Sequence, residues 1–147
     1  MLILLWLLLG LLGGTAILAY SSTQTPEAEK RFLALGLVVA AVIYVGFSLL
    51  WGDSSWLGIE LAGVFFYGLF ALLALRHSIM WLAIGWFLHM GWDAALHLMG
   101  PGLHIVPTWY AYACISYDVL MAGYIVYKFR DLPDDVLVVK QNLHQSS

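Results

Sequence analysis

The stretch LILLWLLLGLLGGTAILAY, residues 2–20, contains no charged side chain. A transmembrane helix needs about 20 consecutive, mostly apolar residues. This stretch therefore predicts a helix that crosses a membrane, and it makes an all-α membrane fold the first hypothesis for the chain. No basic residue precedes the apolar run, as one would in a cleaved secretory signal, so we expect the segment to be retained.

The composition of the whole chain agrees with lipid as its solvent. Hydrophobic residues make up 63% of the 147 residues and charged residues only 10%, whereas a soluble domain has about 45–50% and about 25%. Too few charged groups remain to cover a water-facing surface. The small net charge of −3 argues against nucleic acid as a partner. The only cysteine, Cys114, excludes an internal disulfide and a four-cysteine zinc site.

Four further segments repeat the apolar pattern of the first, and short polar breaks separate them. The sequence therefore predicts one all-α domain over residues 1–130, with five transmembrane helices, followed by a polar tail over residues 131–147. The four further predicted spans are residues 32–51, 56–75, 79–99 and 106–129.

The boundaries between these segments carry residues that begin or end helices. Pro26 and Pro107 suit the first turn of a helix, since the missing proline N–H costs nothing there. Gly100 and Pro101 are placed to end the fourth predicted helix.

The positive charges predict the orientation of the chain. Basic loops tend to stay on the cytoplasmic side of a membrane. With five spans, one orientation places all basic residues there: the N-terminus outside, and the C-terminus with its tail in the cytoplasm. We expect a bacterial inner membrane as the location. The basic residues are Lys30, Arg31, Arg76, Lys128, Arg130 and Lys140.

Ionisable residues interrupt the fourth predicted span at a helical interval. In FLHMGWDAALHLMG, residues 87–100, every fourth residue from His89 through Asp93 to His97 is ionisable. Residues four apart on an α-helix lie about 40° apart around the axis and about 6 Å apart along it, so the three share one face. Ionisable groups inside a membrane are costly and are functional candidates by default.

Two neighbouring spans provide acidic partners. Glu60 lies about one turn inside the outer end of the third span. In the fifth span, counting about 1.5 Å per residue places Asp118 near the level of His89. We therefore expect the last three spans to direct acids and imidazoles into one polar cavity that opens to the outer side.

A metal site is the first chemistry that these residues support. Imidazole and carboxylate ligands suit zinc or iron, and a zinc-bound water with a pKa near 7 could hydrolyse a lipid ester or amide. His89 and His97 are about 12 Å apart along a helix, so one ion would need ligands from another helix. The candidate metal ligands are His89, Asp93, His97, Glu60 and Asp118.

Metal-free acid–base catalysis is the second possibility, with His89, Asp93 and Asp118 as the catalytic residues. A buried carboxyl beside a histidine suits the donation and recovery of a proton. The segment WFLHMGWD, residues 86–93, resembles the His-x-x-x-acid helix of the emopamil-binding, sterol-isomerase-like membrane family. That resemblance implies that His89 and Asp93 shuttle a proton.

Functions without catalysis are also open, and the sequence does not decide whether the chain is an enzyme. A line of histidines and aspartates could conduct protons or a metal ion. The polar groups could equally join helices in an accessory subunit of a membrane complex. The expected partners are the lipid bilayer, a lipid-like or other apolar substrate, and membrane subunits or further copies of this chain.

A wider pattern covers the last three predicted spans. W-x-x-H-x-x-W-D-x-x-x-H runs from Trp86 to His97, and V-P-x-W-Y-x-x-x-C-x-x-Y-D-x-x-x-A-x-Y runs from Val106 to Tyr124. Together they resemble a family of small, uncharacterised integral membrane proteins that carries a domain of unknown function. The resemblance implies the membrane architecture and the choice of residues, but no reaction.

Overall fold

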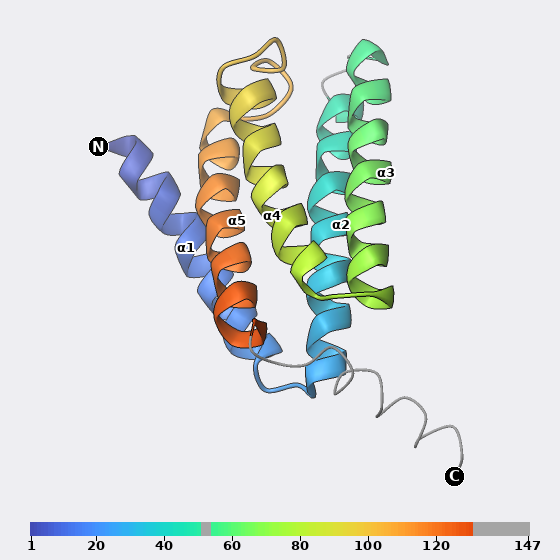
Figure 1. The fold of residues 1–147 in the computed structure, drawn as a ribbon. Coiled ribbons are helices and arrows are strands. Elements are labelled where there is room, and N and C mark those ends of the chain that lie inside the picture. The colour runs from blue at the N-terminus through green and yellow to red at the C-terminus, as the bar shows by residue number, and fades with distance from the viewer. Residues whose placement is uncertain (51–53, 131–147) are drawn as a thin grey trace.

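The computed structural model describes residues 1–50 and 54–130, and these residues are almost entirely helical (Figure 1). No strand occurs among them, which confirms the all-α prediction. The predicted tail, residues 131–147, lies outside the described residues. The elements are α1 (Leu2–Ser21), α2 (Pro26–Leu50), α3 (Ser54–Arg76), α4 (Met80–Trp92), the π-helix η1 (Asp93–Leu98) and α5 (Thr108–Phe129).

The prolines mark helix starts much as the sequence predicts. Pro26 is the first residue of α2, so this helix begins before the predicted apolar span, and Glu27 and Glu29 occupy its first turn. Carboxylates there interact favourably with the positive end of the helix dipole. Pro107 is the cap residue before α5 and lies in an extended conformation, with φ −56° and ψ 129°.

The helices pack in two pairs joined by α4. Helix α1 packs along α5, and α2 packs along α3. Helix α4 contacts both α5 and α3, so it lies between the two pairs (Figure 1). This arrangement brings the ionisable residues of α3, α4, η1 and α5 toward the middle of the bundle.

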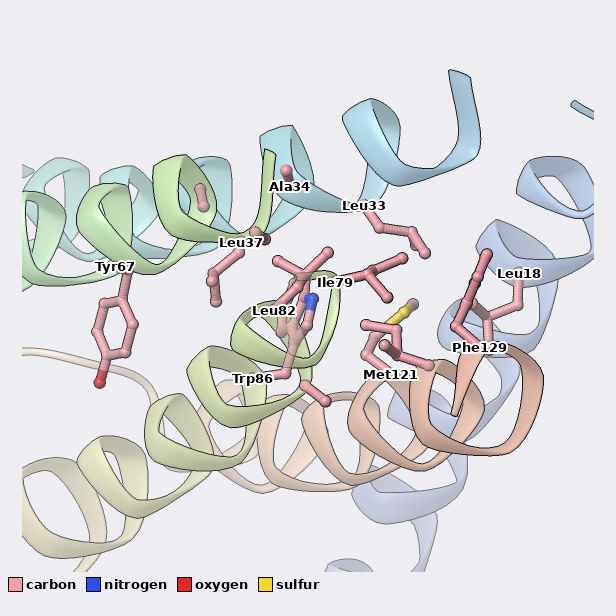
Figure 2. Close-up of a cluster of buried hydrophobic side chains, with 14 of the residues drawn as sticks. Leu18, Leu33, Ala34, Leu37, Tyr67, Ile79, Leu82, Trp86, Met121 and Phe129 are labelled. Atoms are coloured by element: carbon pink, nitrogen blue, oxygen red, sulfur yellow. The ribbon is translucent and has the colours of Figure 1, made fainter. Parts of the chain in front are cut away.

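A hydrophobic core fills the space around α4 (Figure 2). Leu33 and Leu37 of α2 meet Leu82 and Trp86 of α4, and Met121 of α5 belongs to the same cluster. Each of these side chains is buried. The cluster fixes the depth of α4 relative to α5, and therefore the level at which polar side chains on the two helices meet.

The outer surface of the helices is apolar, while several buried positions are small or polar. The buried residues of α1 include Gly10, Gly14 and Ser21, whereas its Leu12 is 61% exposed and Phe65 of α3 is 79% exposed. This distribution is expected for helices whose solvent is lipid. Helices α1, α2 and α3 are long and apolar enough to cross a membrane. The number of spans and their orientation stay predictions.

Glycines allow α1 to approach α5 closely. A Cβ atom at Gly10 would lie 1.9 Å from the carbonyl oxygen of Ala113, and one at Gly14 would lie 2.9 Å from the Leu120 side chain. The Ser116 hydroxyl on α5 donates a 2.7 Å hydrogen bond to the Leu7 carbonyl on α1. Small residues at such positions permit the backbone proximity on which helix contact in lipid depends.

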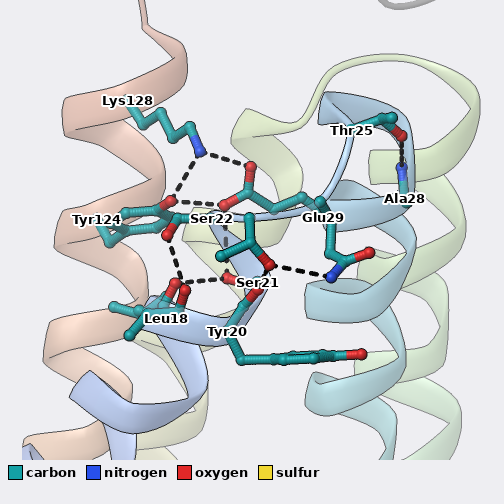
Figure 3. Close-up of polar contacts among 12 residues, drawn as sticks. Leu18, Tyr20, Ser21, Ser22, Thr25, Ala28, Glu29, Tyr124 and Lys128 are labelled. Carbon is teal, nitrogen blue, oxygen red and sulfur yellow. Dashed lines mark hydrogen bonds and ion pairs between the residues drawn. The ribbon is translucent and has the colours of Figure 1, made fainter.

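A buried carboxylate joins the ends of α1, α2 and α5 (Figure 3). The Glu29 carboxylate accepts a 2.6 Å hydrogen bond from the Lys128 ammonium group and a 2.5 Å hydrogen bond from the Tyr124 hydroxyl. The Ser21 hydroxyl donates to the same carboxylate at 3.4 Å. The charge of Glu29 is therefore both paired and hydrogen-bonded, which is the condition for burying it at low cost.

Candidate functional site

Three of the predicted site residues meet where α4, η1 and α5 pack together. His89 lies in the last turn of α4, and its Nδ1 atom is 2.9 Å from Oδ2 of Asp118 on α5. The same Nδ1 atom is 3.7 Å from Oδ2 of Asp93, one turn further along. We call His89, Asp93 and Asp118 the His89 centre. The 2.9 Å contact confirms the prediction that Asp118 and His89 lie at one level.

The His89 centre is closed to solvent and incompletely hydrogen-bonded. Its three residues are at most 1% exposed. Nε2 of His89 and both carboxylate oxygens of Asp93 have no hydrogen-bond partner among the described residues. Buried polar groups in proteins are nearly always satisfied, so several unsatisfied atoms at one place call for an explanation, such as an ion.

The charge of the His89 centre is a second reason to expect a bound cation. If both carboxyls are ionised, the single imidazole can neutralise only one of them, and one negative charge stays buried. A buried unpaired charge is strongly unfavourable. A bound cation would remove this imbalance, and so would a proton on one of the carboxyls.

The segment that carries Asp93 and His97 has the π-helical form η1. Each turn of a π-helix closes through an i→i+5 hydrogen bond and so contains an additional residue; here Met99 N–H donates to the Ala94 carbonyl. His97 follows His89 by eight residues, about two helical turns, so it is separated from the His89 centre along the helix axis. π-Helical segments occur often at functional sites.

His97 pairs with Glu60 of α3. Its Nε2 atom is 3.3 Å from Oε1 of Glu60, and its Nδ1 atom is 3.2 Å from the Gly102 carbonyl. A carbonyl only accepts, so Nδ1 carries the proton in that contact. Both side chains are buried. The structure thus divides the five predicted ligands into the His89 centre and a separate His97–Glu60 pair.

Two tyrosines that the sequence analysis did not select form walls of the site. The ring of Tyr44 lies between the two groups, with its centroid 5.5 Å from that of His89 and 4.8 Å from that of His97. The Tyr67 ring lies 4.9 Å from His89. The sequence signal that could have identified them is a tyrosine hydroxyl near the middle of each of two mostly apolar predicted spans.

The surroundings of the centre differ from the expected polar cavity open to the outer side. Asp93 and its neighbours are enclosed by side chains. The cavity that reaches the centre lies between α1, α2 and α5, touches Asp118 and is mostly apolar. The reason is that α1 packs against α5, which places an apolar helix beside the ionisable residues.

Comparison with known proteins places the chain in a family but gives no activity. Residues 5–131 match DUF6010, a family of unknown function. This confirms the predicted resemblance to a small uncharacterised family. No curated protein and no solved structure is detectably similar to the chain. The local likeness to the emopamil-binding family stays a prediction.

Proposed function

The chain belongs to DUF6010, a family of unknown function, and from the geometry we propose that it is an integral membrane protein whose His89 centre binds one zinc or iron ion. We further propose that it uses the ion in an enzymatic reaction on a lipid or other apolar substrate. The observation that carries this proposal is the convergence of His89, Asp93 and Asp118, whose ligand atoms lie within 4.8 Å of one another.

The distances support a metal site. With ligands at about 2.0–2.1 Å from zinc, each ligand–ligand edge of a tetrahedron is about 3.3–3.4 Å long. The two edges from His89 Nδ1 are 2.9 and 3.7 Å, and the ligand atoms of all three residues lie within 4.8 Å of one another, so the three residues could reach one ion once their side chains adjust. The proton on Nδ1 would be replaced by the metal.

Three protein ligands would leave a fourth position open, as in catalytic zinc sites. Zinc held by these residues would supply a bound water with a pKa near 7, the nucleophile that hydrolysis needs. Hydrolysis of an ester would add this water across the acyl C–O bond: the oxygen joins the acyl carbon, and the proton leaves with the alcohol. Without a metal, His89 and Asp93 would serve as the acid–base pair of the alternative mechanism.

A second candidate function rests on the His97–Glu60 pair. Together with Tyr44 it extends the buried ionisable groups from the His89 centre toward α3. A line of this kind is suited to passing protons or a metal ion without catalysis. Alternatively, the same polar groups would only join helices, and the protein would be an accessory subunit of a membrane complex.

We also propose five spans with the N-terminus outside and the C-terminus in the cytoplasm. The Glu29–Lys128 contact supports this by joining the start of α2 to the end of α5. Arg76 ends α3, which returns to the same end of the bundle (Figure 1). Basic residues therefore gather at one end, which the positive-inside rule assigns to the cytoplasm.

Metal titration of the detergent-purified protein tests the proposal. After chelation, we expect the wild type to take up one equivalent of Zn²⁺ or Fe²⁺, measured by equilibrium dialysis and elemental analysis. Asp118→Asn and His89→Gln should each weaken binding by about 100-fold or more, because outer ligand partners alone are worth about 10–100-fold.

Glu60→Gln is the matched control, since it alters a buried acid outside the His89 centre. It should bind metal like the wild type. No uptake of either ion by the wild type, or equal loss of binding in Glu60→Gln and Asp118→Asn, would contradict the proposed centre.

A further inference from the structure

A cavity of about 550 Å³ lies between α1, α2 and α5. Its volume is in the range of small-molecule sites, which is about 300–1,000 Å³. Most of its lining residues belong to α1 and α2 and are apolar side chains or glycines, and Trp86 of α4 and residues of α5 complete the wall. Asp118 is the single acidic residue of the lining.

The helix packing explains why the cavity exists. Helix α1 follows α5, while α2 follows α3, so α1 and α2 approach each other only near the loop that joins them (Figure 1). Glycines widen the space between them. A Cβ at Gly13 would meet nothing within 4 Å, and one at Gly36 would lie 3.5 Å from the Trp86 ring.

The length of the cavity matches one lipid chain. Its wall extends over residues 9–17 of α1 and 32–43 of α2, which is about 12–16 Å at about 1.5 Å per residue. One leaflet of a bilayer contributes about 15 Å, half of the hydrocarbon thickness of about 30 Å. An acyl chain of a membrane lipid is the apolar molecule of this length that surrounds a protein in a bilayer.

The α5 wall of the cavity carries a residue of the His89 centre. Asp118 both lines the cavity and contacts His89 at 2.9 Å. The indole N–H of Trp86, another lining residue, has no acceptor among the described residues.

We propose that this cavity is a lateral binding site for the acyl chain of a membrane lipid, which enters from the bilayer between α1 and α2 and presents its ester or amide group to the His89 centre. The inference rests on the proposed function and names its substrate class. The apolar wall would bind the chain, and Asp118 would mark the position of the carbonyl.

Photolabelling tests the site. The probe is the methyl ester of a palmitic acid that carries a diazirine in its chain, added to the purified full-length protein before irradiation. We expect mass spectrometry to find the label on lining residues such as Leu9 and Val39. Gly13→Leu would fill the cavity and should reduce this labelling by at least about 5-fold, while leaving zinc binding unchanged.

Gly46→Leu is the matched control, because a Cβ at Gly46 also meets nothing within 4 Å but the residue is outside the lining. It should be labelled like the wild type. Label confined to outward-facing residues such as Tyr127, and unaffected by Gly13→Leu, would overturn the inference. So would a dimer in mild detergent whose lining residues are protected, since a second copy would then occupy the cavity.

The two proposals can fail separately. Zinc binding without labelling of the cavity would remove the lipid site and leave the metal centre. Labelling of the cavity in a protein that binds no metal would support the lipid site and contradict the proposed centre.

Discussion

Without metal, we expect Asp93→Asn to unfold at a higher temperature than the wild type and to gain no stability from added zinc. Both carboxylate oxygens of Asp93 are buried without a hydrogen-bond partner among the described residues, and the Asp118 carboxyl belongs to the same cluster. The amide removes one negative charge from this cluster. It also removes a metal ligand, so stability without metal and metal binding should change in opposite directions.

The expected magnitudes are measurable by thermal unfolding in detergent. An unsatisfied buried polar group costs about 1–3 kcal/mol, and about 1 kcal/mol corresponds to about 2–4 °C in a chain of this size class. Zinc at about 100 times its Kd should raise the stability of the wild type by about 2.7 kcal/mol. Without metal, Asp93→Asn should therefore unfold at a higher temperature than the wild type. It should lack the further stabilisation that zinc gives the wild type.

The reverse outcome identifies a structural role for the polar groups. If Asp93→Asn unfolds at a lower temperature while zinc has no effect on the wild type, the His89 centre only joins α4 to α5. Glu60→Gln is again the control, and it should keep the full stabilisation by zinc because Glu60 contacts His97 instead.

We expect Gly10→Ala to destabilise the protein, although alanine has the higher helix propensity by about 1 kcal/mol. The new Cβ would lie 1.9 Å from the Ala113 carbonyl oxygen and 2.2 Å from the Ser116 hydroxyl. Backbone cannot move aside cheaply, so α1 must shift along or away from α5. Overpacking of this kind costs about 1–3 kcal/mol and occasionally more.

Gly13→Ala is the matched control on the same helix, since its Cβ would meet nothing within 4 Å. Thermal unfolding should show it equal to or slightly more stable than the wild type. Equal stability of Gly10→Ala and Gly13→Ala would contradict the close packing of α1 on α5.

The helices could be predicted from the sequence because apolar run length and proline position act locally. The meeting of His89 with Asp118 could be predicted as well, since both lie on helices of known rise between recognisable ends. The Gly10–Gly14 spacing in the sequence is typical of close helix contact. It does not reveal that the partner is α5, which depends on how the whole bundle packs.

The separation of His97 from His89 could be predicted, since residues eight apart on a helix lie about 12 Å apart along its axis. The pairing of His97 with Glu60 could not, because it depends on how α3 packs beside η1. The position of Tyr44, whose ring lies between His89 and His97, also depends on helix packing. The cavity could not be predicted either, because it forms where α1 and α2 diverge in space.

Anomalous diffraction at the zinc edge from crystals of the zinc-loaded protein tests the His89 centre most directly. The account predicts one peak at about 2.0–2.2 Å from a ring nitrogen of His89 and from one carboxylate oxygen each of Asp93 and Asp118. A peak between His97 and Glu60, or no ordered zinc at either position, would contradict it.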